Sequence, residues 1–157
     1  MRIGQGIDVH RFSEDRNREL VLGLVHLDGE QGLVGHSDAD VVTHALIDAL
    51  LGAANLGDIG RHFPDSDPAN LGIASRVMLD ETLGLLSRAG YRPVSGDVTI
   101  LAEKPRLAPH MPTMSEALSA AVGCVVSVKA TTTEGLGPIG RREGIAAMAI
   151  VLAEEMP

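Results

Sequence analysis

The chain has 157 residues, and its 13 Lys and Arg against 21 Asp and Glu give a formal net charge of −8 at pH 7, so we expect one acidic domain spanning residues 1–157. An aromatic content of 2% together with the acidic charge argues against a nucleic-acid-binding protein. The single cysteine, Cys124, rules out an intrachain disulfide and a cysteine zinc cluster, and no apolar stretch is long enough for a membrane span or a secretion signal, which predicts a cytoplasmic location.

Hydrophobic periodicity predicts five strands and three helices that alternate along the chain. The predicted strands cover about residues 2–9, 20–26, 97–103, 125–131 and 144–152, and the predicted helices cover about 39–54, 71–89 and 113–122. Ser37 and Asp38 are the candidate N-caps of the first helix. Alternation without a repeat or a linker predicts an α+β protomer, an α/β sandwich in which helices pack on one face of a mixed β-sheet. Three loops remain, at about 55–68, 104–112 and 133–142, where functional residues tend to gather.

A candidate metal site combines the first strand with the first helix. Asp8 and His10 stand two residues apart in the strand, so their side chains point to one face. Asp40, His44 and Asp48 recur every four residues and share one helix stripe. If strand and helix pack together, the Asp8, His10 and His44 donors suit Zn²⁺ or a similar divalent ion with a fourth position open to substrate, and Asp48 supports them. Alternatively, Asp8 ends the strand, His10 lies in a loop and His44 is a polar residue on the helix surface.

His36 directly precedes the first predicted helix, where it could donate a hydrogen bond to an anion near the helix N-terminus. Capping by Ser37 or Asp38 explains the same segment equally well. We interpret the remaining histidines as ordinary surface or loop residues: His26, His62 and His110.

Gly135, Gly137 and Gly140 spell G-x-G-x-x-G, the dinucleotide-binding pattern. We reject that interpretation, because the pattern requires a helix after the last glycine and a strand-like run follows here. A hairpin-like connection is expected instead, in which threonines 131–133 approach a phosphate and Glu134 holds a hard metal ion. The alternative is a simple turn between strands.

The basic run Lys104-Pro105-Arg106 is a second candidate phosphate loop, because an acidic protein needs local positive charge to attract an anion. A solvated basic loop is the alternative. Asp65 and Asp67 have the spacing of a calcium loop, but the following Pro68 and the missing Gly and Glu argue against an EF-hand.

Six motifs then carry a resemblance that covers nearly the whole chain. They are GIDVHRF at 6–12, GHSDADVVTHAL at 35–46, LGAANLGDIGRHFPDSDP at 51–68, DVTILAEKPR at 97–106, KATTTEGLG at 129–137 and GRREGIA at 140–146. In this order and spacing the chain resembles the 2-C-methyl-D-erythritol 2,4-cyclodiphosphate synthase family. The resemblance implies a lyase of the non-mevalonate isoprenoid pathway that converts 4-diphosphocytidyl-2-C-methyl-D-erythritol 2-phosphate to the cyclic diphosphate and CMP.

The resemblance also implies an assembly and two metal ions. We expect a homotrimer with active sites between neighbouring subunits, and an isoprenoid diphosphate is a candidate ligand of its central cavity. Asp8, His10 and His44 match the ligands of Zn²⁺ or another divalent cation, and Glu134 matches a ligand of Mg²⁺ or Mn²⁺. A mature plastid chain without its transit peptide would share these features, so a plastid origin stays open beside a bacterial one.

Two residues, His36 and Thr132, match the catalytic groups that stabilise the transition state. The implied substrate-binding positions are Asp8, Val9, His10, His36, Ser37, Asp58, Ile59, Gly60, Phe63, Pro64, Asp65, Ser66, Asp67, Ala102, Lys104, Pro105, Arg106, Leu107, Ala108, Thr131, Thr132, Thr133, Glu134, Ile139 and Arg141. Two other functions would use similar residues: a metal-dependent phosphatase or nucleotidase that activates water, and a trimeric receptor that binds isoprenoid diphosphates without turnover.

Overall fold

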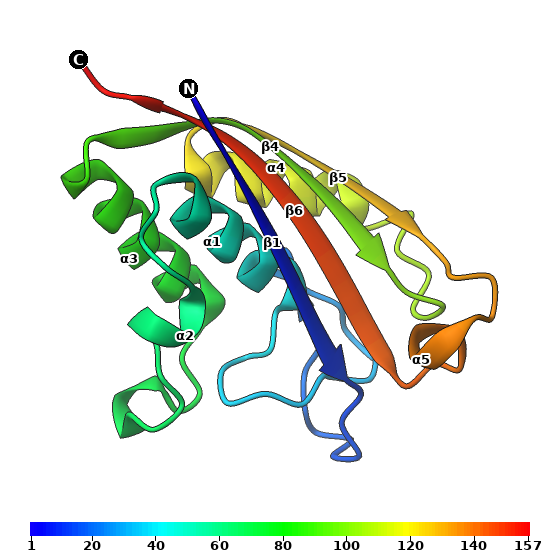
Figure 1. Cartoon of the computed structure of the whole chain (residues 1–157). Coiled ribbons are helices and arrows are strands. Elements are labelled where there is room, and N and C mark those ends of the chain that lie inside the picture. The colour runs from blue at the N-terminus through cyan, green and yellow to red at the C-terminus, as the bar shows by residue number, and fades with distance from the viewer.

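Four strands form one mixed β-sheet in the computed structural model, which describes all 157 residues. They are β1 (Arg2–Arg11), β4 (Tyr91–Leu101), β5 (Val125–Thr131) and β6 (Gly144–Glu155), in the order β1-β6-β4-β5. β6 is antiparallel to β1 and to β4, whereas β5 runs parallel to β4. Figure 1 shows the strands side by side, with both chain termini at one end of the sheet.

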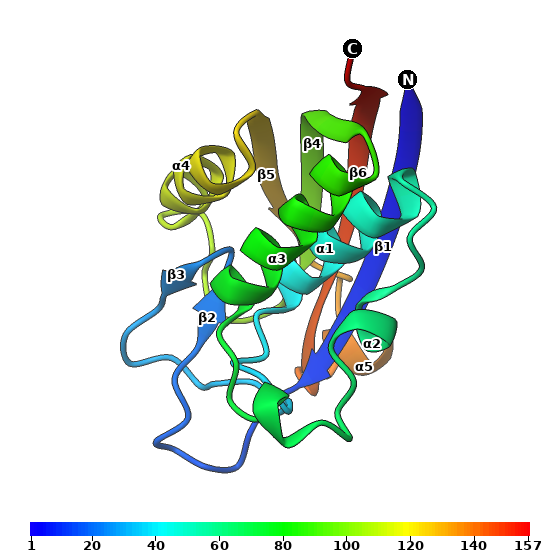
Figure 2. The ribbon, with the colours of Figure 1, turned by 90° about the vertical axis from the view of Figure 1, so that its left-hand side faces the viewer.

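Three helices cover one face of this sheet, and the other face is bare (Figure 2). α1 (Val41–Ala53) packs on β1 and β6, α4 (Met111–Val122) packs on β5, and α3 (Ser75–Arg88) lies against α1. Side chains such as Leu46 and Leu118 fill the buried core between helices and sheet. The predicted mixed sheet with helices on one face is therefore confirmed. No helix combines the length and the apolar character needed to cross a membrane.

Two glycines let β1 lie against α1 at backbone distance. A Cβ atom at Gly4 would lie 1.8 Å from the Ala49 carbonyl oxygen, and one at Gly6 would lie 2.0 Å from the Ala45 carbonyl oxygen. Only glycine allows two backbones to approach so closely. Asp8 follows on the same face of the strand, because side chains alternate along it. The close packing therefore brings Asp8 against the first turn of the helix.

The predicted strand at 20–26 is wrong, because it is two short strands joined by a tight turn. β2 (Val21–Leu22) pairs with β3 (Val25–His26), and the turn residues Gly23 and Leu24 have φ values of 58° and 66°. Positive φ at both central positions is typical of a two-residue hairpin turn. The buried Asp40 carboxylate accepts hydrogen bonds from both turn N–H groups, each at 2.8 Å, and so fixes the turn.

The predicted caps of the first helix are also wrong. Asp40 caps α1, and its carboxylate accepts hydrogen bonds from the backbone N–H groups of Val42 at 3.2 Å and Thr43 at 3.0 Å. Ser37 and Asp38 serve instead in contacts with the preceding loop, with His44 and with α3. Asp40 consequently faces the β2–β3 turn. Of the three residues predicted to share a helix stripe, only His44 and Asp48 lie on the side of the candidate metal site.

Short helical turns lie inside two predicted loops. α2 (Ile59–His62) falls within 55–68, and α5 (Gly137–Gly140) falls within 133–142. A 3-10 turn at Pro68–Asn70 follows α2. The second predicted helix begins at Ser75 rather than near residue 71, because the intervening Gly72 has a left-handed φ of 71°. The third helix begins at residue 111, two residues before its predicted start.

The hairpin-like connection predicted between β5 and β6 is wrong. These strands do not pair, because β4 lies between them and pairs with both. The connection therefore crosses over β4 and includes α5. The rejection of a dinucleotide-binding fold is consistent with the structure, because β6 follows the last glycine of the pattern after only a short turn.

Candidate active site

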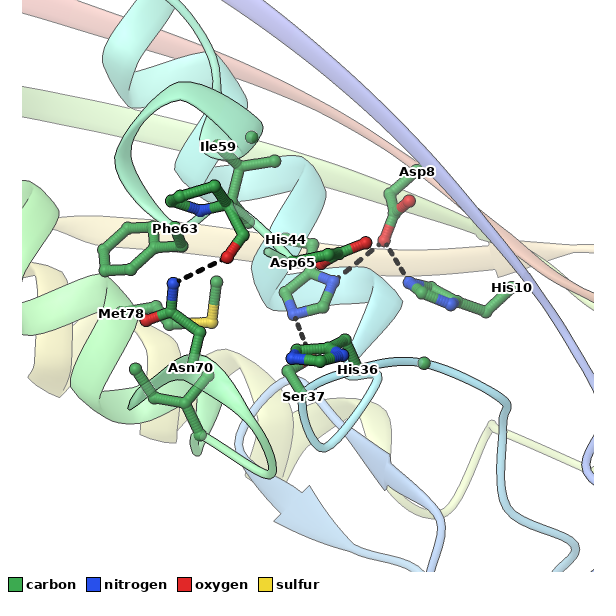
Figure 3. Close-up of a pocket in the computed structure, with 14 residues that line it drawn as sticks. Asp8, His10, His36, Ser37, His44, Ile59, Phe63, Asp65, Asn70 and Met78 are labelled. Atoms are coloured by element: carbon green, nitrogen blue, oxygen red, sulfur yellow. Dashed lines mark hydrogen bonds and ion pairs between the residues drawn. The ribbon is translucent and has the colours of Figure 1, made fainter. Parts of the chain in front are cut away.

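Asp8, His10 and His44 converge at the edge of the sheet formed by β1 (Figure 3). Asp8 Oδ2 lies 2.9 Å from His10 Nε2 and 3.0 Å from His44 Nδ1. One ligand atom from each residue can be chosen so that all three lie within 4.8 Å of one another. The strand supplies two of these side chains and the helix supplies the third, as the sequence predicted.

Hydrogen bonds at the far side of each imidazole hold the rings in place. His10 Nδ1 donates to the Val34 carbonyl oxygen at 2.6 Å, since a carbonyl can only accept. In the neutral ring this leaves the Nε2 lone pair directed at Asp8. His44 Nε2 lies 3.0 Å from Ser75 Oγ and 3.2 Å from Ser37 Oγ, so its Nδ1 faces Asp8.

The donor set fits a divalent ion. One carboxylate oxygen and two imidazole nitrogens are common ligands of Zn²⁺ at sites that leave a fourth position open. His10 Nε2 is buried and has no hydrogen-bond partner of acceptable geometry, although Asp8 Oδ2 lies only 2.9 Å away. An arrangement in which two lone pairs face each other at this distance is favourable only when a cation or a proton lies between them.

Charge interactions couple the three residues. Burial by itself raises the pKa of Asp8, but its close contacts with the His10 and His44 imidazoles and the charges of these rings outweigh burial and lower that pKa well below its ordinary value. Burial alone lowers the pKa of His10, and the close contact with the Asp8 carboxylate and its negative charge reverse this effect and raise it. A proton and a metal ion therefore compete for the same lone pairs.

The three residues open onto a cavity of about 440 Å³ between β1, α1 and α2. Its other lining residues are Gly35, His36, Ser37, Ile59, Gly60, Phe63, Pro64, Asp65, Asn70, Ile73 and Met78. His36 Nε2 is buried there without a hydrogen-bond partner. Figure 3 shows His36 and Ser37 on the side of His44 away from Asp8. The structure thus brings His36, Ser37 and most of the predicted 58–67 loop to one cavity with the metal cluster.

Four of the substrate-binding residues predicted in β1 and in the 58–67 loop do not line this cavity. Val9 points to the opposite face of the sheet, where the residue is 58% exposed. Asp58 caps α2 by accepting a hydrogen bond from the Arg61 N–H at 2.9 Å. Asp67 caps the following 3-10 turn, and Ser66 lies beside it, outside the cavity lining.

Arg18, which sequence reasoning missed, holds the segment that carries His36. Its guanidinium donates to the carbonyl oxygens of Leu33 at 3.0 Å and Gly35 at 3.2 Å, and also to that of Ser37. No local pattern reveals this role, because the partners lie 15 to 19 residues further along the chain.

Asp48 lies one helical turn beyond His44 and outside the ligand cluster. Its Oδ1 accepts a hydrogen bond from the Ile59 N–H at 2.7 Å, which ties α2 to α1. Burial raises the pKa of Asp48, and the nearby charges of Asp58 and Asp8 add to that effect. This contact agrees with the predicted supporting role.

A second cavity, of about 590 Å³, lies where β4 and β5 end. Its lining includes the predicted residues Ala102, Lys104, Pro105, Arg106, Leu107, Ala108, Thr131 and Thr132. Glu103, which the sequence did not single out, also lines it and organises the next loop. Its Oε1 accepts hydrogen bonds from Thr133 N–H at 3.0 Å and Gly135 N–H at 3.3 Å.

The last predicted residues are not in the lining of this second cavity: Thr133, Glu134, Ile139 and Arg141. Glu134 Oε1 accepts a hydrogen bond from Thr132 Oγ1 at 2.9 Å, and Glu134 is not part of the metal cluster. Ile139 lies in α5, and Arg141 pairs with Glu143 at 2.7 Å.

The two cavities lie at opposite edges of the sheet. Asp8 is on β1, and Thr131 ends β5, with β6 and β4 between them. Three strand spacings separate the two backbones by about 14 Å. Both places are nevertheless at the same end of the sheet, because His10 pairs with Ile145 and Leu101 pairs with Ala146 and with Thr131.

Comparison with family models identifies the class of protein to which this fold belongs. The YgbB family model matches residues 1–154, and the chain belongs to the YgbB family.

The relatives give this family a function. The chain is 54% identical to the 2-C-methyl-D-erythritol 2,4-cyclodiphosphate synthase of Syntrophomonas wolfei over 99% of both chains. Its fold matches the bifunctional IspDF of Campylobacter jejuni with a TM-score of 0.93 and 37% identity, over 99% of this chain and 42% of that chain. It also matches a CDP-bound 2C-methyl-D-erythritol-2,4-cyclodiphosphate synthase with a TM-score of 0.87 and 35% identity, over 98% of this chain and 100% of that chain.

Proposed function

We propose that this chain is a metal-dependent lyase that converts 4-diphosphocytidyl-2-C-methyl-D-erythritol 2-phosphate to 2-C-methyl-D-erythritol 2,4-cyclodiphosphate and CMP. The observation that carries the proposal is the convergence of Asp8, His10 and His44 on one cavity in a member of the YgbB family. The organisation as a single domain and the cytoplasmic location stay predictions.

Asp8, His10 and His44 would hold Zn²⁺ or another divalent cation, and Glu134 would hold Mg²⁺ or Mn²⁺ together with the substrate diphosphate. Such ions supply positive charge and Lewis acidity to phosphoryl oxygens. Support for the first site comes from the unpartnered, buried His10 Nε2 and from the mixed oxygen and nitrogen donors. Support for the second is an exposed carboxylate beside the Thr132 hydroxyl.

In the proposed reaction an oxygen of the 2-phosphate attacks the β-phosphorus of the same substrate. The bond between that phosphorus and the oxygen bridging to the α-phosphorus breaks, and CMP leaves with that oxygen. The 2-phosphate is already mostly ionised near neutral pH, because its second pKa is about 6, so no general base is required. The chain therefore has to align the two phosphates and to neutralise their charge. We assign His36 and Thr132 as donors to the phosphoryl oxygens.

We assign the cavity beside α2 to the methylerythritol and ribose parts of the substrate, and the cavity after β4 and β5 to the cytidine and phosphates. Val9 contributes through its backbone, because its side chain points to the other face. Lys104 and Arg106 supply the local positive charge that a chain of net charge −8 needs near an anionic ligand. Ile139 and Arg141 would reach the phosphate site from α5 and its end.

We also propose that the chain works as a homotrimer, with each active site shared between neighbours. The two candidate cavities lie at opposite sheet edges, so a substrate that contacts both needs the second cavity of an adjacent copy. The bare sheet face offers an apolar surface for this contact: Ile3, Ile7 and Val9 on β1 and Met148 and Ile150 on β6, with Ile3 73% exposed. Such a surface is unusual for a monomer.

Within such a trimer the bare faces would enclose a central cavity. We keep an isoprenoid diphosphate as its candidate ligand, because the apolar side chains suit the hydrocarbon. The exposed Arg142 near the end of the sheet suits the diphosphate.

The proposed reaction is tested by its products. The purified chain is incubated with the cytidine-diphosphate substrate, Mg²⁺ and Zn²⁺, and phosphorus NMR follows the products, with EDTA as control. We expect a cyclic diphosphate and CMP in equal amounts, and neither after chelation. Inorganic phosphate or an open-chain diphosphate would support the hydrolase instead, and an unchanged substrate bound to a metal-loaded trimer would support the receptor.

A further inference from the structure

We propose that Asp38 and Ser75 form a hydrogen-bond relay that fixes which nitrogen of His44 is free to bind the metal ion. The inference rests on the proposed metal site and names two positioning residues for it. Asp38 lies in the loop before α1, and Ser75 is the first residue of α3, so the relay joins both segments to His44 on α1.

The geometry of Ser75 leaves little freedom. Ser75 is fully buried, and its hydroxyl donates a hydrogen bond to Asp38 Oδ1. Its backbone N–H also donates to Asp38 Oδ2 at 2.8 Å, so two hydrogen bonds join Ser75 to the Asp38 carboxylate. Asp38 is itself held by the hydrogen bond from its N–H to the Ile73 carbonyl oxygen at 3.1 Å.

The direction of the protons follows from these bonds. A hydroxyl has one hydrogen, and the Asp38 carboxylate can only accept, so the Ser75 hydrogen points to Asp38. Ser75 Oγ must then accept from the other neighbour, His44 Nε2, which lies 3.0 Å away. Nε2 therefore carries hydrogen, and in the neutral ring the Nδ1 lone pair is free on the side of Asp8. Metal-bound histidines commonly donate their other N–H to a carboxylate, and here a serine is inserted between the two groups.

Ser37 does not replace this relay. Its Oγ lies 3.2 Å from His44 Nε2 and already accepts from the Ala39 N–H, but its hydroxyl hydrogen is not held by a carboxylate. Ser37 can therefore either accept from Nε2 or donate to it, and it selects neither form of the ring. The selection depends on Asp38 and Ser75.

The test measures zinc affinity by competition with a coloured chelator, at one fixed pH, on the full chain. We expect Ser75→Ala to bind Zn²⁺ about 10 to 100 times more weakly than the wild type, the range observed when such supporting partners are removed. The matched control is Thr82→Val. Thr82 is on the same helix and equally buried, and its hydroxyl has no partner, so its loss should leave zinc affinity unchanged.

A second variant, Asp38→Asn, keeps the proposal testable if Ser75→Ala does not fold. An amide placed there can turn its NH₂ toward the Ser75 hydroxyl, which then donates to His44 Nε2 and leaves the hydrogen on Nδ1. We expect zinc affinity to fall, while the melting temperature of the metal-free Asp38→Asn chain stays close to that of Thr82→Val. Wild-type zinc affinity in both Ser75→Ala and Asp38→Asn would overturn the relay.

A third variant separates this inference from the metal site on which it rests. His10→Ala removes a proposed ligand and should abolish tight zinc binding. If His10→Ala binds zinc as tightly as the wild type, the metal site itself is wrong. If His10→Ala loses zinc while Ser75→Ala and Asp38→Asn keep it, the metal site stands and the relay fails.

Discussion

At one edge of the sheet, Asp8, His10 and His44 come from a regular strand and a regular helix that touch through two glycines. At the other edge, Lys104, Arg106 and Thr132 come from connections after β4 and β5, and they surround a more open cavity. Each metal-site histidine is hydrogen bonded on its far side, whereas at the second cavity Glu103 holds the backbone N–H groups of Thr133 and Gly135 in the neighbouring turn.

The difference indicates that the two proposed tasks, metal binding and nucleotide binding, have different structural requirements. A metal site needs ligands placed within a few tenths of an ångström, and packed backbones provide that accuracy. A nucleotide pocket can be completed by a neighbouring chain and by the ligand, so loops suffice. The experiments below change one of the two regions and ask whether the other responds.

The largest effect is expected from Gly6→Ala in the β1–α1 contact. The new methyl would lie 2.0 Å from the Ala45 carbonyl oxygen, so strand and helix must separate. Urea unfolding should show a loss of about 3 kcal/mol or more, with loss of zinc binding. The control is Gly52→Ala on α1, on the other side of the same contact, where the new methyl would lie 3.8 Å from the nearest atom, the Gln5 carbonyl oxygen. That change should leave stability unchanged or raise it by up to about 1 kcal/mol. Similar stability for both variants would show that the glycine contact does not hold the site.

The next effect concerns the sharing of sites between copies. His44→Ala and Thr132→Ala should each abolish turnover alone, because each removes one half of every site. When the two variants are coexpressed and form mixed trimers at random, about one quarter of the sites should have both halves intact. Turnover of the mixture should therefore recover to about that fraction of the wild-type value. Recovery of no more than the sum of the separate variants would indicate that the two halves belong to one chain.

Asp48→Ala tests whether α2 must be tied to the metal region. Without the Asp48 carboxylate, the Ile59 N–H loses its acceptor, and the substrate loop is held less firmly. A loss of about 1 kcal/mol in the free energy of substrate binding predicts that KM rises about five- to tenfold, while zinc affinity stays unchanged. Asp48→Asn retains an acceptor oxygen and should recover most of the loss. A change in zinc affinity rather than in KM would place Asp48 among the ligands.

The smallest effect is the pH dependence of the metal-free chain. The folded pKa of His10 is raised, so its contribution to stability is complete below its ordinary value of 6.5 and is lost as pH rises through the folded value. The pKa of Asp8 is lowered, so its contribution is present above its ordinary value of 3.8 and is lost on acidification. The stabilisation by the Asp8–His10 pair should therefore be greatest between pH 3.8 and 6.5. In that range the free energies of unfolding of the wild type and of Asp8→Asn, measured by thermal unfolding, should differ most, by on the order of 1 kcal/mol. A difference that does not vary with pH would contradict the coupling.

Local spacing was sufficient to predict the metal region. The alternation of Asp8 and His10 along a strand and the position of His44 on a helix follow from the periods of the two elements. Sequence alone could not identify Ser75, because it is 31 residues from His44 and meets it only when α3 packs against α1. The same reason explains the wrong caps: Asp40 is preferred over Ser37 because it also binds the β2–β3 turn.

The loop region was predicted less well, because strand pairing is not a local property. A turn rich in glycine suggested a hairpin between β5 and β6, but β4 occupies the place between them. The two short helices in the loops have only four residues each and give no periodic signal. The motifs still located both cavities, and the roles of their substrate-binding residues stay predictions.

The most direct test of a shared, metal-dependent site is a crystal structure of the chain grown with Zn²⁺ and CDP, with an anomalous map at the zinc edge. We predict a zinc peak about 2.0 to 2.2 Å from Asp8 Oδ2, His10 Nε2 and His44 Nδ1. The cytosine of the CDP that faces that zinc should lie against Lys104 and Arg106 of a neighbouring copy. Zinc at other residues, or zinc and the cytosine of its CDP held by one and the same chain, would contradict the account.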